Sequence, residues 1–302
     1  MITPPFLKPG DKIAITAPSR YITPEELRSA IKIFNDWGFE VVTGKYIYNR
    51  SDQFGGTDNE RSQDFQEKLD DPSVKAVIAA RGGYGAIRTL TNLNFDQFVL
   101  HPKWIIGYSD ITFFHSHINQ NLKIKTLHAS MPINFSNYSP DDNSLIKIKK
   151  VLIGNQIEYS WDSNPLNRQG EATAELTGGN LSVLYSLRGT PYDLITKNKI
   201  LFIEDVDEYL YHIDRMMMNF KLGNKLNELS ALVVGGMTDM KDNKVPFGKS
   251  AVEIINDTVR NYNYPVCFDL PAGHIKNNFP LILGNKYKLT IKDKTCVLKT
   301  ID

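Results

Sequence analysis

The stretch KWIIGYSDITFFHSHIN, residues 103–119, changes character at its middle. Its first part, up to Tyr108, is a short apolar run that predicts a buried β-strand. From Ser109 onward, the residues are typical of a helix. A serine therefore lies where a buried strand is expected to turn into a helix, and we interpret the rest of the chain outward from this unit.

The same alternation continues on both sides of this stretch. Residues 23–39 begin with the capping-box spacing of Thr23 and Glu26, which predicts a helix. Alternating helices and nearly continuous apolar strands predict a parallel sheet with helices on both faces. In such sheets ligands bind beyond the carboxyl ends of the strands, where the loops RGGYG (81–85) and GYSD (107–110) are both expected. Further strands are predicted at residues 12–18, 40–44, 74–80 and 125–130.

The composition changes between residues 133 and 168, where Asn, Ser, Asp and Pro are frequent. This composition is typical of a connection, so we expect a linker between two domains. The N-terminal domain is then predicted over residues 1–132 and the C-terminal domain over residues 169–302. The second domain contains its own buried strands and helical segments.

Composition and charge limit the possible functions. The chain has 302 residues, of which 41% are hydrophobic, and a formal net charge of +1, so we expect no nucleic-acid partner. Cys267 and Cys296 lack the spacing of a disulfide framework or a metal site. We find no signal-peptide pattern and no apolar stretch of the ~20 residues that span a bilayer. We therefore expect a cytoplasmic protein with no membrane partner.

Ser109 has two interpretations. A serine after a strand often caps the next helix, and position alone does not separate this role from that of a nucleophile. A serine hydroxyl becomes nucleophilic only with the help of a base. The strand–turn–helix arrangement would also supply N–H donors for an oxyanion. The usual G-x-S-x-G signature is absent, since Ile111 occupies its last glycine position.

The loop RGGYG (81–85) follows the third predicted strand. Two consecutive glycines allow the backbone to turn tightly and to approach a ligand. Their N–H groups could complete an oxyanion hole or hold a phosphate, and a purely structural turn fits the pattern equally well. The glycine spacing matches neither a dinucleotide-binding motif nor a P-loop.

Two further residues have the chemistry that an activated serine needs. Glu204 ends the apolar run ILFI, where an unpaired charge is costly to bury. His274 lies in a glycine-bounded loop, although a lone histidine is more often structural. In a Ser-His-acid set, histidine takes the serine proton and the carboxylate orients the histidine. His115 and His117 would face different sides of a helix, so we expect no metal site there.

Five motifs together resemble the LD-carboxypeptidase family of serine peptidases. They follow the family's order and cover nearly the whole chain, and the opening PPFLKPGDKIAITAPS (4–19) is similar as well. The stretch LHASMP (127–132) departs from the family, which often has a His-Gly-Pro-like stretch at this place. This difference bears on the local shape of the substrate pocket and therefore on the exact substrate. The motifs are ARGGYGAIRTL (80–90), PKWIIGYSDIT (102–112), TGGNLSVL (177–184), ILFIEDVDEYLYHIDRMM (200–217) and LPAGHIKNNFPLILG (270–284).

The resemblance implies an α/β fold, with a parallel-sheet, flavodoxin/Rossmann-like N-terminal domain and a smaller β-rich C-terminal domain. It implies a catalytic triad of Ser109, His274 and Glu204. It also implies an oxyanion hole of backbone N–H groups, which we place at Gly83 and Asp110. The implied reaction removes the terminal D-alanine from murein tetrapeptide during cell-wall recycling in the cytoplasm. Family members are commonly homodimers, and we expect neither a cofactor nor a metal.

Three alternatives stay open at this point. Arg81 could bind the free carboxylate that an exopeptidase must recognise, or it could form a structural salt bridge. Some relatives in the family hydrolyse a peptide-nucleotide antibiotic and confer self-immunity. An amidase of that kind is therefore the second functional hypothesis, beside the carboxypeptidase. A non-catalytic protein that binds muropeptides is a third, although an intact Ser-His-Glu set argues against it.

Overall fold

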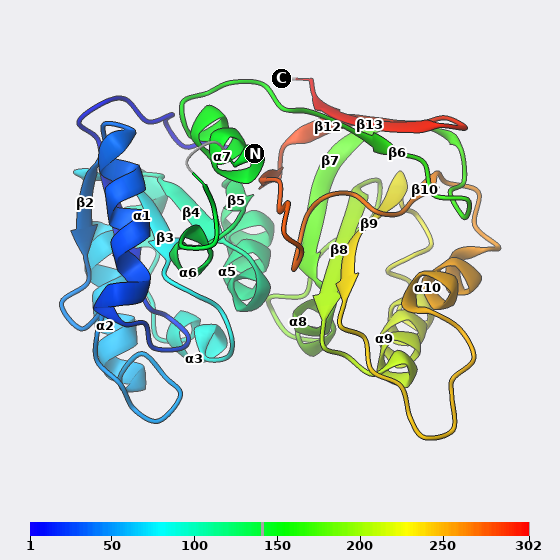
Figure 1. Ribbon diagram of the computed structural model, residues 1–302, viewed down its shortest axis with the longest axis horizontal. Coiled ribbons are helices and arrows are strands. Elements are labelled where there is room, and N and C mark those ends of the chain that lie inside the picture. The colour runs from blue at the N-terminus through cyan, green and yellow to red at the C-terminus, as the bar shows by residue number, and fades with distance from the viewer. Residues whose placement is uncertain (140–141, 302) are drawn as a thin grey trace. The chain divides into compact units, whose positions relative to one another are not determined.

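The structure, a computed structural model, describes residues 1–139 and 142–301 (Figure 1). The chain forms two compact units, each of which has its own sheet. The first unit comprises Met1–Asn155 together with Phe279–Ile282, and the second comprises Gln156–Asn278 together with Leu283–Asp302. No helix within the described ranges combines the length and the apolar composition that crossing a membrane requires.

The sheet of the first unit has the strand order β11-β5-β4-β3-β1-β2. Strands β1 to β5 pair in parallel, which confirms the predicted flavodoxin/Rossmann-like sheet. Because β1 lies between β2 and β3, the strand order reverses there, and sheets of this order bind ligands beside the reversal. The strands are β1 (Lys12–Thr16), β2 (Glu40–Thr43), β3 (Val74–Ala79), β4 (Trp104–Gly107), β5 (Thr126–His128) and β11 (Leu281–Leu283).

Helices of the first unit begin where the sequence provides caps. The predicted capping box is present, since Thr23 accepts from the N–H of Glu26 and the Glu26 carboxylate accepts from the N–H of Thr23. Thr57 and Glu60 form an equivalent box at the next long helix. The helices that connect the strands are α1 (Pro24–Asp36), α2 (Asp58–Asp70), α3 (Ala86–Leu90), α4 (Asp96–Leu100) and α5 (Thr112–His117), with a π-helical turn at Ile118–Leu122.

The stretch 133–168, which we expected to be a linker, contains regular structure. Helices α6 (Pro132–Phe135) and α7 (Asn143–Leu152) belong to the first unit, and strand β6 (Glu158–Asp162) belongs to the sheet of the second. The expectation rested on local composition. In α7, however, apolar side chains recur at helical spacing and bury one face among polar neighbours. Residues 140 and 141 of this stretch lie outside the described residues.

The sheet of the second unit has the strand order β10-β9-β8-β7-β12-β13-β6. Strands β7 to β10 pair in parallel, and β12, β13 and β6 continue the sheet in antiparallel pairs. The C-terminal part is therefore rich in strands, as the resemblance implied. The remaining strands are β7 (Gly170–Asn180), β8 (Ile200–Val206), β9 (Ala231–Thr238), β10 (Val266–Cys267), β12 (Lys286–Ile291) and β13 (Thr295–Thr300).

Three helices, α8 (Leu181–Ser186), α9 (Leu210–Leu222) and α10 (Ala251–Val259), accompany the parallel half of this sheet. Buried residues of these helices form one core cluster with residues of β8 and β9. This packing holds the ends of the parallel strands in register, so that Asn180 of β7 lies opposite Glu204 of β8. The carboxyl ends of the strands therefore present polar side chains at a fixed edge.

Candidate active site

Ser109 lies directly beyond β4, at the carboxyl edge of the first sheet. Its φ angle is +61°, in the left-handed region that residues other than glycine rarely adopt. Strain of this kind costs on the order of 1–3 kcal/mol and concentrates at functional sites. The side chain is partly exposed although both neighbours, Tyr108 and Asp110, are buried. A strained serine between a strand and a helix has the geometry of a nucleophile elbow.

Ser109 does not cap the helix that follows it. It is the first residue of a 3₁₀ turn, Ser109–Ile111, and α5 begins only at Thr112. The N-cap position of α5 is Ile111, and no side chain makes a capping hydrogen bond at either start. The structure therefore does not support the cap interpretation of Ser109.

The glycine loop 81–85 lies close to the 3₁₀ turn Ser109–Ile111, which we call the serine turn. A Cβ atom added to Gly82 would lie 3.1 Å from Cβ and 3.2 Å from Oγ of Ser109. Gly83 has a φ of +111°, and a Cβ atom there would lie 2.1 Å from Cδ of Arg20. Within the described part of the chain, the N–H groups of Gly83 and Asp110 donate to no backbone carbonyl outside their own turns. Such N–H groups are suited to bind an oxyanion.

The side chain of Asp110 is buried and joins three segments. Its Oδ2 accepts hydrogen bonds from the hydroxyl of Ser19, at 2.6 Å, and from the N–H of Ala86, at 2.8 Å. Burial raises the pKa of Asp110 to about 6, although both hydrogen bonds act in the opposite direction. Asp110 thus ties the serine turn to the segment after β1 and to the start of α3.

Arg81, the predicted carboxylate-binding residue, has partners within the protein. Its Nη1 donates to the carbonyl of Tyr21 at 3.4 Å and lies 3.9 Å from Oε1 of Glu26. Glu26 is itself part of the capping box of α1. These contacts correspond to the structural salt bridge that the sequence left as the alternative role.

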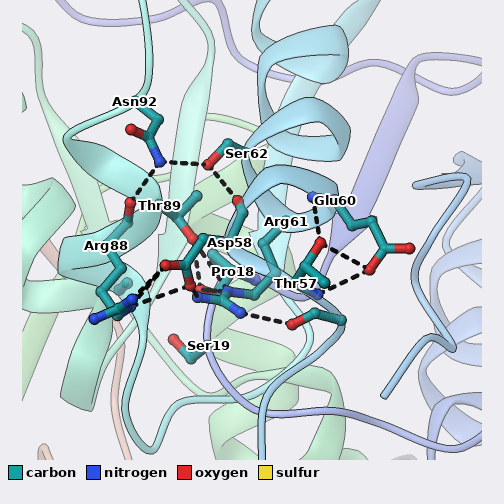
Figure 2. A network of polar contacts seen from close by, with 12 residues as sticks. Pro18, Ser19, Thr57, Asp58, Glu60, Arg61, Ser62, Arg88, Thr89 and Asn92 are labelled. Atoms are coloured by element: carbon teal, nitrogen blue, oxygen red, sulfur yellow. Dashed lines mark hydrogen bonds and ion pairs between the residues drawn. The ribbon is translucent and has the colours of Figure 1, made fainter. Parts of the chain in front are cut away.

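A network of polar side chains joins α2, α3 and the segment after β1 (Figure 2). The side chain of Arg61 is fully buried, and its Nε donates to the carbonyl of Pro18 at 3.1 Å. The hydroxyl of Thr89 donates to the same carbonyl at 2.8 Å. Asp58 forms ion pairs with both Arg61 and the more exposed Arg88. The network therefore fixes the segment after β1, from which Ser19 reaches the serine turn.

Glu204 lies on β8 of the second unit and is completely buried. Its Oε2 accepts two hydrogen bonds from His274, one from Nδ1 at 2.7 Å and one from the backbone N–H at 3.1 Å. A buried carboxylate requires such partners, because an unpaired charge is costly to remove from water. The structure thus brings together the predicted acid and base.

Two glycines make room for this pair. Gly273 has a φ of +106°, and a Cβ atom there would lie 2.6 Å from Oε2 of Glu204. At Gly235, on the neighbouring strand β9, a Cβ atom would lie 2.4 Å from the carbonyl oxygen of Ala272 and 3.3 Å from Cβ of Glu204. The N–H of Gly273 donates to the buried side chain of Asn278 at 2.9 Å. The loop that carries the histidine is therefore held from both sides.

The pKa of His274 is raised above its usual value. Burial lowers this pKa, but the negative charge of Glu204 and the hydrogen bond to it raise the pKa by more. The adjacent Asp205 is also buried, and burial, together with the charge of Glu204, raises the pKa of Asp205 to about 7. Asp205 accepts from Asn180 and from the N–H of Ser182, both at 2.9 Å, so it anchors the start of α8.

Other residues with potential chemistry have structural surroundings. His115 is buried with its Nε2 2.9 Å from the carbonyl of Gly107, and burial lowers the pKa of His115 to about 4. His128 is also buried, and Cys267 and Cys296 are free and buried. Among the described residues, no group of three or more His, Cys, Asp or Glu side chains could hold a metal ion.

Sequence reasoning did not identify every residue around these groups. Ser19 and Arg20 follow the first predicted strand at the same sheet edge as the glycine loop, and that position was the available signal. Arg61 lies in a polar helix, where the sequence gives no sign that its side chain is buried. Asn180 and Asn278 lie within the quoted motifs, but an asparagine alone has no distinctive chemistry.

Comparisons with known proteins agree with the motifs. Residues 13–129 match the LD-carboxypeptidase N-terminal domain and residues 173–289 match the LD-carboxypeptidase C-terminal domain. The "Probable murein peptide carboxypeptidase" of Bacillus subtilis is 33% identical over 98% of this chain and 94% of its own length. The crystal structure of muramoyltetrapeptide carboxypeptidase from Oxalobacter formigenes is 29% identical, with a TM-score of 0.88 over 96% of this chain and 99% of that one. The "Microcin C7 self-immunity protein MccF" of Escherichia coli is 24% identical over 94% of this chain and 92% of its own length.

Proposed function

The chain belongs to the LD-carboxypeptidase family, and from this premise we propose that it is a serine peptidase that releases the terminal D-alanine from murein tetrapeptide. The observation that carries the proposal is the buried Glu204–His274 pair, with Nδ1 of the histidine 2.7 Å from the carboxylate. The strained backbone of Ser109 supports the assignment of the nucleophile.

In this mechanism the hydrogen bond to Glu204 holds a proton on Nδ1 of His274 and makes Nε2 the basic nitrogen. Nε2 takes the proton from the hydroxyl of Ser109 as Oγ attacks the carbonyl at the L-configured centre of the diamino acid. The protonated histidine then donates that proton to the amine of the departing D-alanine. Water, deprotonated by the same histidine, hydrolyses the acyl-enzyme and restores the serine.

The tetrahedral intermediates carry a negative oxygen that needs hydrogen-bond donors. We assign this role to the N–H groups of Gly83, in the glycine loop, and of Asp110, the residue after the serine. A Cβ atom added to Gly82 would contact the serine side chain, which supports the placement of the glycine loop close to Oγ of Ser109. A single oxyanion donor contributes about 3 kcal/mol in hydrolases where one has been removed.

The choice of substrate follows the relatives whose names refer to murein peptides. We further propose that the enzyme works in the cytoplasm, where peptides recovered from the cell wall are processed. Arg81 remains a candidate for binding the free carboxylate, but its bonds to Tyr21 and Glu26 already account for its position. The proposed activity requires no cofactor and no metal.

The test is mass spectrometry of murein tetrapeptide incubated with the purified protein and with the Ser109→Ala variant. We expect loss of one D-alanine with the wild type and none with the variant. Ser29→Ala, at a partly exposed position on α1, is the matched control and should leave the rate unchanged. An intact tetrapeptide after incubation with folded wild-type protein would refute the murein assignment.

The similarity to the microcin C7 self-immunity protein motivates a second candidate, an amidase that hydrolyses an aminoacyl nucleotide. The same serine, histidine and glutamate would carry that reaction. Incubation with an aminoacyl sulfamoyl adenosine separates the two candidates, because only the amidase would release the amino acid from it. The third hypothesis, a non-catalytic muropeptide-binding protein, is opposed by the Glu204–His274 pair, since binding alone does not need an oriented base.

A further inference from the structure

Arg20 lies beyond β1, at the point where the strand order of the first sheet reverses. Its backbone forms an antiparallel bridge with Phe54, and the carbonyl of the preceding Ser19 accepts from the N–H of Gly55 at 3.0 Å. The hydroxyl of Ser19 donates to Asp110 in the serine turn. The backbone of Arg20 is therefore held firmly at the edge where ligands of such sheets bind.

The side chain of Arg20 extends over the glycine loop. A Cβ atom on Gly83 would lie 2.1 Å from Cδ and 2.5 Å from Cγ of Arg20. A Cβ atom on the adjacent Gly82 would instead contact Ser109. Gly82 therefore faces the side chain of Ser109 and Gly83 faces the arginine stem. The Cα atoms of these consecutive glycines are about 3.8 Å apart.

The positive charge of Arg20 has no counter-charge among the described residues. Its Nε is buried and has no hydrogen-bond partner there, and Arg20 takes part in none of the ion pairs between described residues. Three other arginines of this unit, Arg61, Arg81 and Arg88, each pair with a carboxylate. An unsatisfied buried donor is costly, so an anion that binds here would remove a penalty as well as gain an attraction.

We propose that Arg20 binds the free terminal carboxylate of the peptide and thereby makes the enzyme an exopeptidase. This inference rests on the proposed function. In a peptide that loses one residue, the scissile carbonyl and the terminal carboxylate are separated by a single residue. That separation matches the single-residue step between Gly82, which faces Ser109, and Gly83, which faces the stem of Arg20. A guanidinium group suits the task because its planar donors match a carboxylate.

The experiment compares two substrates, murein tetrapeptide and the same peptide with its terminal carboxylate converted to the carboxamide. We measure kcat/KM for both with the wild type, Arg20→Gln and Arg20→Lys. Glutamine retains the Cγ and Cδ atoms that cover Gly83 but lacks the charge, so it separates recognition from packing. Arg28→Gln, at an exposed position on α1, is the matched control.

We expect the wild type to prefer the free acid and Arg20→Gln to lose about 10- to 100-fold in kcat/KM for the acid, as befits a charged hydrogen bond. The loss should arise mainly in KM, the amide should be cleaved at nearly the wild-type rate, and Arg20→Lys should retain part of the preference. Arg28→Gln should match the wild type on both substrates.

Two outcomes would overturn the inference in different ways. Equal losses on acid and amide would mean that Arg20 only supports the fold, and an unchanged preference would mean that another group binds the carboxylate. In the second case, the same pair of substrates tested on Arg81→Gln would show whether Arg81 does so. If the wild type cleaves neither peptide, the proposed function itself fails, and this inference fails with it.

Discussion

At the scale of single residues, the proposed reaction depends on a carboxylate, that of Glu204, which is buried away from water. Glu204 is buried at the end of an apolar strand, and its pairing with His274 is what makes that burial tolerable. A carboxylate at the end of an apolar run needs a partner, so a partner for Glu204 could be expected from the sequence, and the family resemblance implied that this partner is His274. The sequence did not reveal Arg61 or Arg20, because the burial of an arginine depends on segments distant in the chain.

Replacement of Glu204 by glutamine should lower kcat by about 10³- to 10⁴-fold, since the histidine would no longer be held in the productive tautomer. It should also change the pH profile. In the proposed mechanism neutral His274 is the base, so kcat/KM should rise with pH through the pKa of this residue, which lies above its usual value in the wild type. Without the charge of Glu204, burial dominates, and the rise should move to lower pH. A rise at unchanged pH in Glu204→Gln would contradict the assigned pair.

Gly273→Ala tests how closely the backbone must approach Glu204. The added Cβ would lie 2.6 Å from Oε2, and φ is +106°, so clash and backbone strain should together cost more than about 2 kcal/mol of stability and most of the activity. Gly248→Ala is the matched control, since Gly248 has a φ of +86° and no atom within 4 Å of the added Cβ. Thermal unfolding and kcat should separate the two variants. Equal effects would mean that strain alone is responsible.

At the scale of elements, the structure shows how short turns are held between strands and helices. The capping box of α1 and the alternation of strands and helices could be predicted because they depend on neighbours in the sequence. The helices and the strand within 133–168 were not predicted, since polar residues around α7 obscured its apolar face. The 3₁₀ turn after β4 was not predicted either, because it depends on contacts with the glycine loop.

The serine turn should respond to pH through Asp110. Its pKa is raised to about 6 in the folded protein, so its contribution to stability is full below its unfolded pKa of about 4 and is lost as pH rises to about 6. Asp110→Asn keeps an oxygen acceptor without this charge, so its stability should fall less over that range, by on the order of 3 kcal/mol. Urea unfolding at several pH values measures the difference. Parallel curves for the two proteins would contradict the assignment.

Asp110→Ala serves as the companion variant in that experiment. It removes the acceptor for both Ser19 and the N–H of Ala86, so it should be less stable than the wild type at neutral pH by about 1–3 kcal/mol for each group left unsatisfied. If the asparagine and alanine variants were equally stable, the two hydrogen bonds would contribute nothing.

The network between α2 and α3 offers a comparison between a buried and an exposed arginine. Arg61→Ala should destabilise the protein by about 3–5 kcal/mol, because a fully buried group that bonds to the carbonyl of Pro18 is lost. Arg88→Ala should cost at most about 1 kcal/mol, because the side chain of Arg88 is half exposed although it pairs with the same Asp58. Chemical denaturation of both variants checks this. Similar losses would show that exposure does not control the strength of these pairs.

At the scale of the whole molecule, the resemblance predicts a homodimer. Sedimentation should therefore give twice the 34.3 kDa mass of one chain, independent of concentration in the working range of the enzyme. A single species with the mass of one chain would contradict the predicted homodimer and would leave the proposed catalytic residues unaffected. The fold class itself could be predicted from the motifs, whereas the assignment of chain segments to the two units could not.

That assignment has a consequence for the history of the gene. Residues Phe279–Ile282 return from the second unit to supply part of β11, the edge strand next to β5 in the first sheet. A gene fragment that ended at Asn155 would encode a sheet without β11, in which the buried strand β5 becomes an unpaired edge, and exposed apolar edges favour aggregation. The two units therefore cannot be separated or exchanged by a single recombination event. The proposed nucleophile and the proposed base, encoded far apart, must therefore be inherited together.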